Sequence, residues 1–297
     1  MFTNKDVMEL RKKTGAGVAD CKKALEQTEG DMDKAVDFLR EKGIATAAKK
    51  ASRIAAEGIV SAKVEGNVGV LVEVNCETDF VAKGDLYKEF VNDVVEYVFA
   101  NDVKDVDQLI EDKKDDTINA TAKIGEKISI RRFAKITAEN GVVTSYIHMG
   151  GKVGVLVEIE GCTCDGTKEL AHDIALQVAA SKPLYLNAQE VPAEVIEKEK
   201  EILLAQIEND EKLKNKPEMV KAKMVEGKVG KYYDENCLMN QAFIKDPSLS
   251  IEKLIKDASA KMGKELSVKR FVRFEMGEGL EKRSDNFADE VAAQMNK

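Results

Sequence analysis

One apolar stretch decides the fold because it occurs twice: V-G-V-L-V-E-V at residues 68–74 and V-G-V-L-V-E-I at residues 153–159, 85 residues further on. Each copy is a continuous run of mainly β-branched residues, short enough for a strand and apolar enough to be buried. A repeat of this length and identity indicates that the chain contains two related structural units.

Each copy is preceded by a similar short strand, at residues 58–61 and 141–144. Glycines between the paired stretches, in residues 65–67 and 149–151, favour tight hairpin turns because glycine tolerates positive φ. The sequence therefore predicts one β-hairpin at the start of each unit.

A second repeated element closes each unit. K-I-G-E-K-I-S-I-R-R-F at residues 123–133 matches K-M-G-K-E-L-S-V-K-R-F at residues 261–271, 138 residues further on. Apolar stripes with helical spacing lie between the hairpin and this final strand: Tyr87, Phe90, Val91, Val94, Val95 and Val98 in the first unit, and Leu170, Ile174 and Val178 in the second. The predicted fold class is α+β, with two units side by side because each has one apolar sheet face to bury.

The second unit is 53 residues longer between its shared elements, and the extra chain is mostly residues 187–235. Two charged amphipathic arms, the first opening at Pro192, are separated by a break at residues 214–217, where a proline ends helical geometry. This pattern predicts a helical hairpin that protrudes from the core. A purely stabilising hairpin and a surface for a partner or a second copy are equally compatible with it.

The N-terminal residues predict a small helical head. Helical patterns cover residues 4–13 and 18–27, and a third helix is capped by Asp31 and expected to end at Gly43. Three short helices with a glycine-rich first turn resemble a ubiquitin-associated-type bundle. Residues 45–57 are expected to be a helical linker.

The expected organisation is as follows: head and linker, 1–54; first core unit, 55–140; second core unit, first part, 141–186; inserted hairpin, 187–235; second core unit, second part, 236–276; C-terminal module with a short capped helix, 277–297.

Composition and charge restrict the function. The 297 residues carry a net charge of −8, which argues against direct nucleic-acid binding because phosphate recognition needs a basic face. No apolar run approaches the ~20 residues that span a bilayer. The N-terminus has neither a signal peptide nor a transit peptide pattern, so we expect a cytoplasmic protein with no membrane association.

No enzyme constellation is present. The chain lacks the phosphate-binding, dinucleotide-binding and nucleophile-elbow motifs. Its two histidines, His148 and His172, stand in no metal or triad pattern, and Cys162 and Cys164 lack the second ligand pair of a zinc site. We expect no catalytic residue, no cofactor and no metal.

The stretch N-C-E-T-D-F-V-A at residues 75–82 follows the first buried strand and precedes a long helix. On pattern alone, Phe80 is more often a core residue, and Asp79 a helix cap. An aromatic ring beside a carboxylate at such a junction also suits contact with a partner. The corresponding position of the second unit, 85 residues on, is Asp165, so the aromatic residue is not required by the repeated architecture.

Four motifs resemble the bacterial elongation factor Ts family: L-R-K-K-T-G-A-G-V-A-D-C-K-K-A-L at 10–25, V-N-C-E-T-D-F-V-A at 74–82, V-A-A-S-K-P at 178–183 and R-F-E-M-G-E-G at 273–279. They run in order over nearly the whole chain. The resemblance implies a guanine-nucleotide exchange factor for the translational GTPase elongation factor Tu.

The resemblance also implies site residues. In the family, the segment matching Thr78, Asp79, Phe80 and Val81 is associated with dislodging Mg²⁺ from elongation factor Tu, the aromatic ring wedging near the metal. Further partner contacts match Arg11, Ile124, Gly125 and His148. The head's contact pair, commonly two methionines, is Val18 and Ala19 here. The hairpin allows a homodimer or, with the partner, a heterotetramer.

A second hypothesis is an adaptor or chaperone that binds through the head. It predicts that the head alone keeps the main affinity for the partner, whereas nucleotide exchange requires the duplicated core. A third hypothesis, an enzyme, has no supporting constellation.

Overall fold

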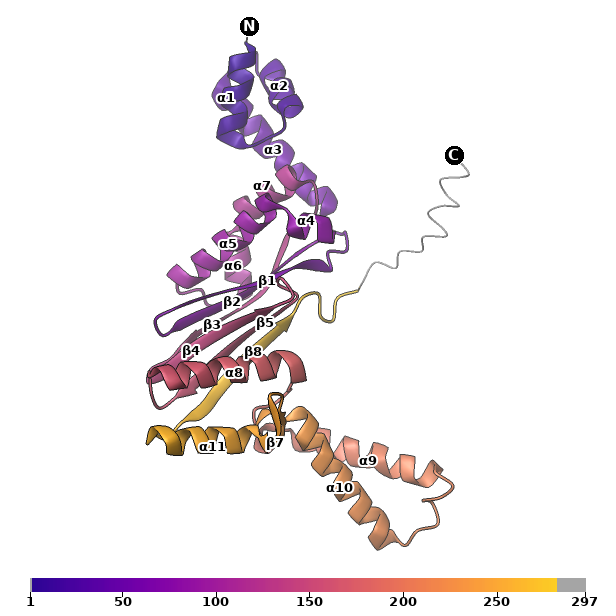
Figure 1. The fold of residues 1–297 in the computed structure, drawn as a ribbon. Coiled ribbons are helices and arrows are strands. Elements are labelled where there is room, and N and C mark those ends of the chain that lie inside the picture. Colours follow the sequence, from indigo (N-terminus) through magenta and orange to yellow (C-terminus); the bar gives the residue numbers. More distant parts are fainter. Residues whose placement is uncertain (1, 282–297) are drawn as a thin grey trace.

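The computed structural model describes residues 2–281, so the short helix predicted in the C-terminal module lies outside the described residues. The structure shows an elongated molecule with a helical head at one end, two sheets in the middle and a helical hairpin at the other end (Figure 1). The mixed α+β class predicted from the sequence is confirmed.

The head consists of three helices: α1 (Asn4–Thr14), α2 (Val18–Gln27) and α3 (Met32–Lys50). Asp31 caps α3 as predicted, its side chain accepting a hydrogen bond from the backbone N–H of Lys34 at 3.1 Å. The expectation that this helix ends at Gly43 is wrong. Gly43 is buried inside α3, where it faces Ala122 and Ile118 of α7, and the helix continues past it to Lys50.

The first core unit contains seven elements: β1 (Glu57–Glu65), β2 (Val68–Cys76), α4 (Asp79–Lys83), α5 (Asp85–Ala100), α6 (Val106–Asp112), α7 (Lys114–Ile124) and β3 (Ser129–Thr137). The strands form an antiparallel sheet in the order β1-β2-β3. Helix α5 packs its predicted stripe on one face of this sheet.

The second core unit repeats this plan with an insertion. Its elements are β4 (Gly141–His148), β5 (Val153–Glu160), α8 (Asp165–Ser181), η1 (Ala188–Glu190), α9 (Ala193–Asn209), α10 (Glu218–Asn236), η2 (Leu238–Asn240), β6 (Ala242–Phe243), β7 (Asp246–Ser250), α11 (Ile251–Met262) and β8 (Ser267–Glu275). The sheet order is β4-β5-β8, again antiparallel. The hairpin turns predicted at residues 65–67 and 149–151 are both confirmed.

The duplication extends to an irregularity in the strands. The β2–β3 register shifts between Glu73 and Val74, and the β5–β8 register shifts between Glu158 and Ile159, the same place in each repeat. Both glutamates are fully buried and meet basic side chains of the neighbouring strand. Glu73 accepts from Arg131 and Arg132 at 2.9 and 2.6 Å, which stabilises a charge that would otherwise be costly to bury.

The two sheets bury both of their faces, not one face each as expected from the sequence. One face packs on the helices of its own unit, and the other packs against the opposite sheet. The repeated glycine of V-G-V-L makes this approach possible. A Cβ on Gly69 would lie 2.5 Å from Val143, and a Cβ on Gly154 would lie 2.4 Å from Val60.

The insertion forms the predicted hairpin of helices, α9 and α10, which project away from the sheets (Figure 1). The first arm ends at Asn209, five residues before the expected break. The arms share a small apolar core that includes Ile196, Leu203, Ile207 and Val225. Within residues 2–281, no helix is both long and apolar enough to cross a bilayer.

Candidate functional site

The stretch that suits partner contact forms a short, exposed loop-and-helix corner at the end of β2. Thr78 has extended backbone angles and caps α4, its hydroxyl accepting from the N–H of Val81 at 3.3 Å. Thr78 therefore performs the capping role that one interpretation assigned to Asp79. Because α4 has only five residues, it can bury one face, and Val81 and Ala82 occupy that face.

Phe80 projects from the opposite side of α4. The residue is 82% exposed, the largest exposure among the exposed large hydrophobic residues of the described chain. The pattern-based expectation of a core residue is therefore wrong. At this position the ring is accessible to a partner.

Glu126, in the turn after α7, holds this corner in place. One of its carboxylate oxygens accepts from the backbone N–H groups of Glu77 and Thr78 at 3.1 and 3.0 Å. The other accepts from the hydroxyl of Thr78 at 2.7 Å. Three donors that flank the start of α4 are thus satisfied by one side chain 48 residues further along the chain.

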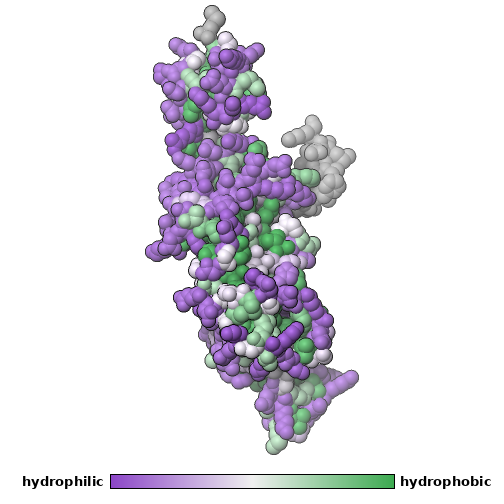
Figure 2. Space-filling view, turned by 60° about the vertical axis from the view of Figure 1, so that its left-hand side comes forward, coloured by the Kyte–Doolittle hydropathy of each residue, from purple (hydrophilic) through white to green (hydrophobic). Residues whose placement is uncertain are grey.

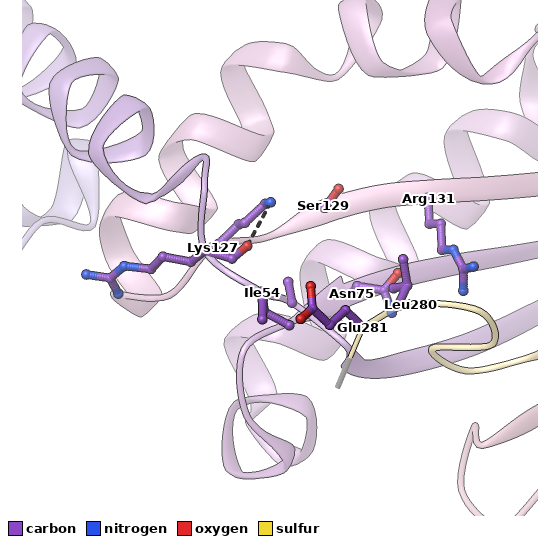
Figure 3. Close-up of a pocket in the computed structure, with 9 residues that line it drawn as sticks. Ile54, Asn75, Lys127, Ser129, Arg131, Leu280 and Glu281 are labelled. Carbon is purple, nitrogen blue, oxygen red and sulfur yellow. Dashed lines mark hydrogen bonds between the residues drawn. The ribbon is translucent and has the colours of Figure 1, made fainter. Parts of the chain in front are cut away.

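A reciprocal set of contacts completes the brace. Glu77 accepts from the backbone N–H of Lys127 at 2.6 Å and pairs with Arg53 at 3.2 Å. A cavity of about 230 Å³ lies beside this set. Arg53 lines this cavity, and Figure 3 shows Lys127 and Arg131 beside it together with the buried Asn75. The dashed contact in Figure 3 joins the Lys127 ammonium to the backbone oxygen of Arg53 at 3.0 Å. The linker after the head is therefore tied to the same corner.

Sequence reasoning did not identify Glu126, Glu77 or Arg53. Charged residues in turns usually face solvent, so nothing in their spacing distinguished them. One signal was present in the repeat, where the position equivalent to Glu126 is Lys264. Because the second unit has a lysine at this position, the carboxylate of Glu126 is a difference between the two units, as is the aromatic residue Phe80.

The charges at the corner are set by near neighbours. Asp79 bonds to Lys83 at 2.6 Å, and this contact lowers the pKa of the Asp79 carboxyl, with a smaller contribution from the charge of Lys152. Lys83 also lies 5.9 Å from the centre of the Phe80 ring, within cation–π range. Just before the corner, burial raises the pKa of the Cys76 thiol to about 12. The corner therefore presents an ionised carboxylate and an aromatic ring, while its thiol is inert.

The structure places Ile124 and Gly125 next to this corner, since they directly precede Glu126. Ile124 is partly buried against the core, and Gly125 is exposed, its backbone oxygen accepting from Lys50 of α3. His148 is exposed at the end of β4, where its Nδ1 lies 2.9 Å from the hydroxyl of Tyr146. The turn that follows His148 is fixed to β1 by a bond from the N–H of Val60 to the oxygen of Gly151 at 2.8 Å.

Arg11, Val18 and Ala19 lie on the head, at some distance along the molecule, and all three are exposed. The head is attached to the core through α3, which packs on α7 and contributes an ion pair between Arg40 and Asp115. In Figure 2 the visible face of the head is mostly hydrophilic, and apolar side chains reach the surface lower down, at the height of the sheets. The predicted residues thus lie in three places: on the head, at the corner formed by α4 and the turn after α7, and at the end of β4.

These features define a class of protein: one that presents an exposed aromatic tip on a braced corner, as a binding protein does. Among residues 2–281, no three His, Cys, Asp or Glu side chains gather as a metal site.

Comparisons with known proteins identify the family. Residues 77–278 match the family described as "Elongation factor TS". The chain is 49% identical to elongation factor Ts of Clostridium novyi, over 100% of this chain and 99% of the relative. It is 48% identical to elongation factor Ts of Halothermothrix orenii, over 99% and 98% of the two chains. The chain belongs to the elongation factor Ts family, whose members are nucleotide exchange factors for elongation factor Tu in translation elongation and not enzymes.

Proposed function

We propose that this chain releases GDP from elongation factor Tu by bringing Phe80 and Asp79 against the Mg²⁺ and phosphate site of the GTPase, so that GTP rebinds during elongation in the cytoplasm. One observation carries the proposal: the ring of Phe80 is 82% exposed at the tip of a corner that Glu126 holds rigid. A rigid tip can displace groups of a partner without first losing conformational freedom of its own.

The target explains why an aromatic ring and a carboxylate suit this task. A translational GTPase holds its nucleotide through P-loop amides and through Mg²⁺, which is bound by oxygen ligands. A phenyl ring offers no ligand to the metal, so its insertion removes space and solvent from the site. Asp79 is ionised at neutral pH, since its ordinary pKa of 3.8 is already far below 7 and the bond with Lys83 lowers that pKa further; its negative charge opposes the phosphates of GDP.

The thermodynamic requirement is that the factor binds the nucleotide-free GTPase more tightly than the GDP-bound form. By reciprocity, GDP or GTP then weakens binding of the factor by the same ratio, so the factor is released when GTP binds.

Thr78 and Val81 serve as anchors of the tip. Arg11, Val18, Ala19, Ile124, Gly125 and His148 provide further contacts with the partner, which hold the tip in register.

The test is release of a fluorescent GDP analogue from elongation factor Tu, with the wild-type chain and with Phe80→Ala. We expect the stimulated rate to fall roughly 30-fold, the equivalent of the about 2 kcal/mol that a central hot-spot side chain contributes. Met219→Ala is the matched control because Met219 is also highly exposed but lies on the hairpin. If Phe80→Ala is folded and stimulates release as well as the control does, the wedge is not the mechanism.

A further inference from the structure

The Cys-Thr-Cys motif of residues 162–164 lies in a sulfur cluster that exchange activity does not explain. The motif connects β5 to α8, and the backbone N–H of Cys164 donates to the sulfur of Cys162 at 3.1 Å. The last residue of α11, Met262, reaches the same place, with its Sδ 3.7 Å from the Sγ of Cys164. The sulfur of Cys162 therefore contacts the backbone of Cys164, and the sulfur of Cys164 contacts that of Met262, so two thiols and a thioether from segments about 100 residues apart lie close to one another.

This cluster occupies the place in the second unit that the exposed tip occupies in the first. By the 85-residue repeat, Cys162 and Cys164 correspond to Glu77 and Asp79. By the 138-residue repeat, Met262 corresponds to Ile124. The duplicated fold thus presents the same three positions in both units, with an aromatic tip beside them in one and a set of sulfur atoms in the other.

We propose that Cys162, Cys164 and Met262 form a binding site for a soft monovalent metal ion of the Cu(I) class. Thiolate and thioether sulfurs are the ligands that select Cu(I) over harder ions. Metal–sulfur bonds of about 2.3 Å in a trigonal arrangement separate the ligand sulfurs by about 4 Å, close to the spacing of Cys164 and Met262. Binding requires no change of oxidation state: each thiol that becomes a ligand releases its proton to solvent.

The surroundings favour a three-coordinate site over a tetrahedral zinc site. The nearest carboxylate in the motif, Asp165, is highly exposed and paired with Lys168 at 2.9 Å. The buried hydroxyl of Thr167 lies 3.3 Å from the sulfur of Cys164 and 3.8 Å from that of Met262. This uncharged group occupies the position where a fourth metal ligand would otherwise stand. Zn²⁺ needs four good ligands in a structural site, and no fourth sulfur or imidazole joins this group in the described chain.

Competition from other thiols is limited by burial. The remaining cysteines, Cys21, Cys76 and Cys237, are fully buried in three separate cores. Cys164 is exposed and Cys162 half-buried, so they are accessible in the folded protein.

The experiment is an anaerobic titration of the full chain with Cu(I) in the presence of a chromophoric Cu(I) chelator. We expect one Cu(I) per chain for the wild type and loss of this binding in Cys164→Ser. Met262→Leu should weaken the affinity by at least about tenfold, because even an outer-shell partner of a metal ligand changes affinity by about 10–100-fold. Leucine preserves the packing of Met262, and a melting curve checks that the variant is folded.

Met219→Leu, on the exposed hairpin, is the matched methionine control and should bind as the wild type does. Zn²⁺ under the same conditions should show no comparable binding. Absence of Cu(I) binding by the wild type, or equal affinity in Met262→Leu and Met219→Leu, would overturn the proposal. Binding that persists unchanged in Cys164→Ser would place the metal elsewhere and also overturn it.

Discussion

Glu126 shows how one side chain can set the geometry of a contact residue that it does not touch. Its carboxylate satisfies two backbone N–H groups and one hydroxyl at the start of α4, whereas Phe80 is held only through α4 itself. Removing that carboxylate leaves three donors without their acceptor, and each unpaired donor has a cost when water cannot replace the acceptor well.

We therefore expect Glu126→Ala to reduce stimulated GDP release even though Phe80 is retained, and to lower the free energy of unfolding by about 1–3 kcal/mol. Fluorescent GDP release and urea unfolding measure the two effects. Lys264→Ala, at the equivalent position of the second unit, is the control and should change neither quantity. Full exchange activity in Glu126→Ala would show that the tip does not depend on this brace.

At the scale of elements, the repeated strand contributes side chains to two different hydrophobic cores. The side chains of Val70, Val72 and Val74 point to the helices, while Leu71 points to the opposite sheet. The glycine that precedes them leaves room for a side chain of the other unit. The spacing between the two sheets is therefore set by a residue with no side chain, a property that hydropathy does not reveal.

Gly69→Ala tests this spacing. A Cβ 2.5 Å from a methyl of Val143 forces that side chain or the sheets to shift, and overpacking of this kind costs about 1–3 kcal/mol of stability by urea unfolding. Gly227→Ala is the matched control because Gly227 lies in α10 with no atom within 4 Å of the new Cβ. That substitution should stabilise the protein by about 0.5–1 kcal/mol, since alanine is the better helix former. A stable Gly69→Ala variant would mean that the sheets can separate at little cost.

At the scale of the whole molecule, the segment after β8 joins the two units. The N–H of Gly277 donates to the buried Glu73 of the first sheet at 2.8 Å, and the N–H of Met276 donates to the oxygen of Lys152 at 2.9 Å. Nearby, Glu275 pairs with Lys182 and Arg273 at 2.9 and 2.7 Å, and these bonds lower the pKa of Glu275 to about 2.

This pKa shift predicts a dependence of stability on pH. Because the folded-state pKa lies below the ordinary value of 4.5, the ion pairs stabilise the fold above pH 4.5, and the contribution is lost as pH falls toward 2. The Glu275 side chain is 38% exposed, so solvent screening reduces the effect to about 1 kcal/mol. Relative to Glu275→Gln, the wild type should be more stable at pH 7, and the difference should disappear near pH 2.

Denaturant unfolding between pH 2 and 7 measures this difference. Glu197→Gln, which removes an exposed pair with Lys200 within one helix, should leave the curve unchanged. A constant difference between wild type and Glu275→Gln over the whole range would show that the Glu275 carboxyl is not responsible.

The amino-acid sequence by itself determined the repeated strands, the helices α5 and α8, the inserted hairpin and the duplication of the core. The apolar stripes of α5 and α8 follow the spacing of side chains on one face of a helix, so they can be recognised in the sequence alone. The resemblance to elongation factor Ts motifs located Thr78–Val81, and the pattern alone had favoured burial of Phe80. Local pattern failed there because hydropathy describes a residue and not the face of the helix on which it lies.

Only the tertiary structure decided which residues meet. The brace from Glu126 to Thr78, the fit of Gly69 against Val143 and the approach of Met262 to Cys164 each join segments far apart in the chain. Sequence periodicity contains information about neighbours along the chain, whereas these contacts depend on how two sheets and their connecting turns pack in space. The exposure of Phe80 follows from the same cause: α4 is anchored by its other face, so the ring has no core left to enter.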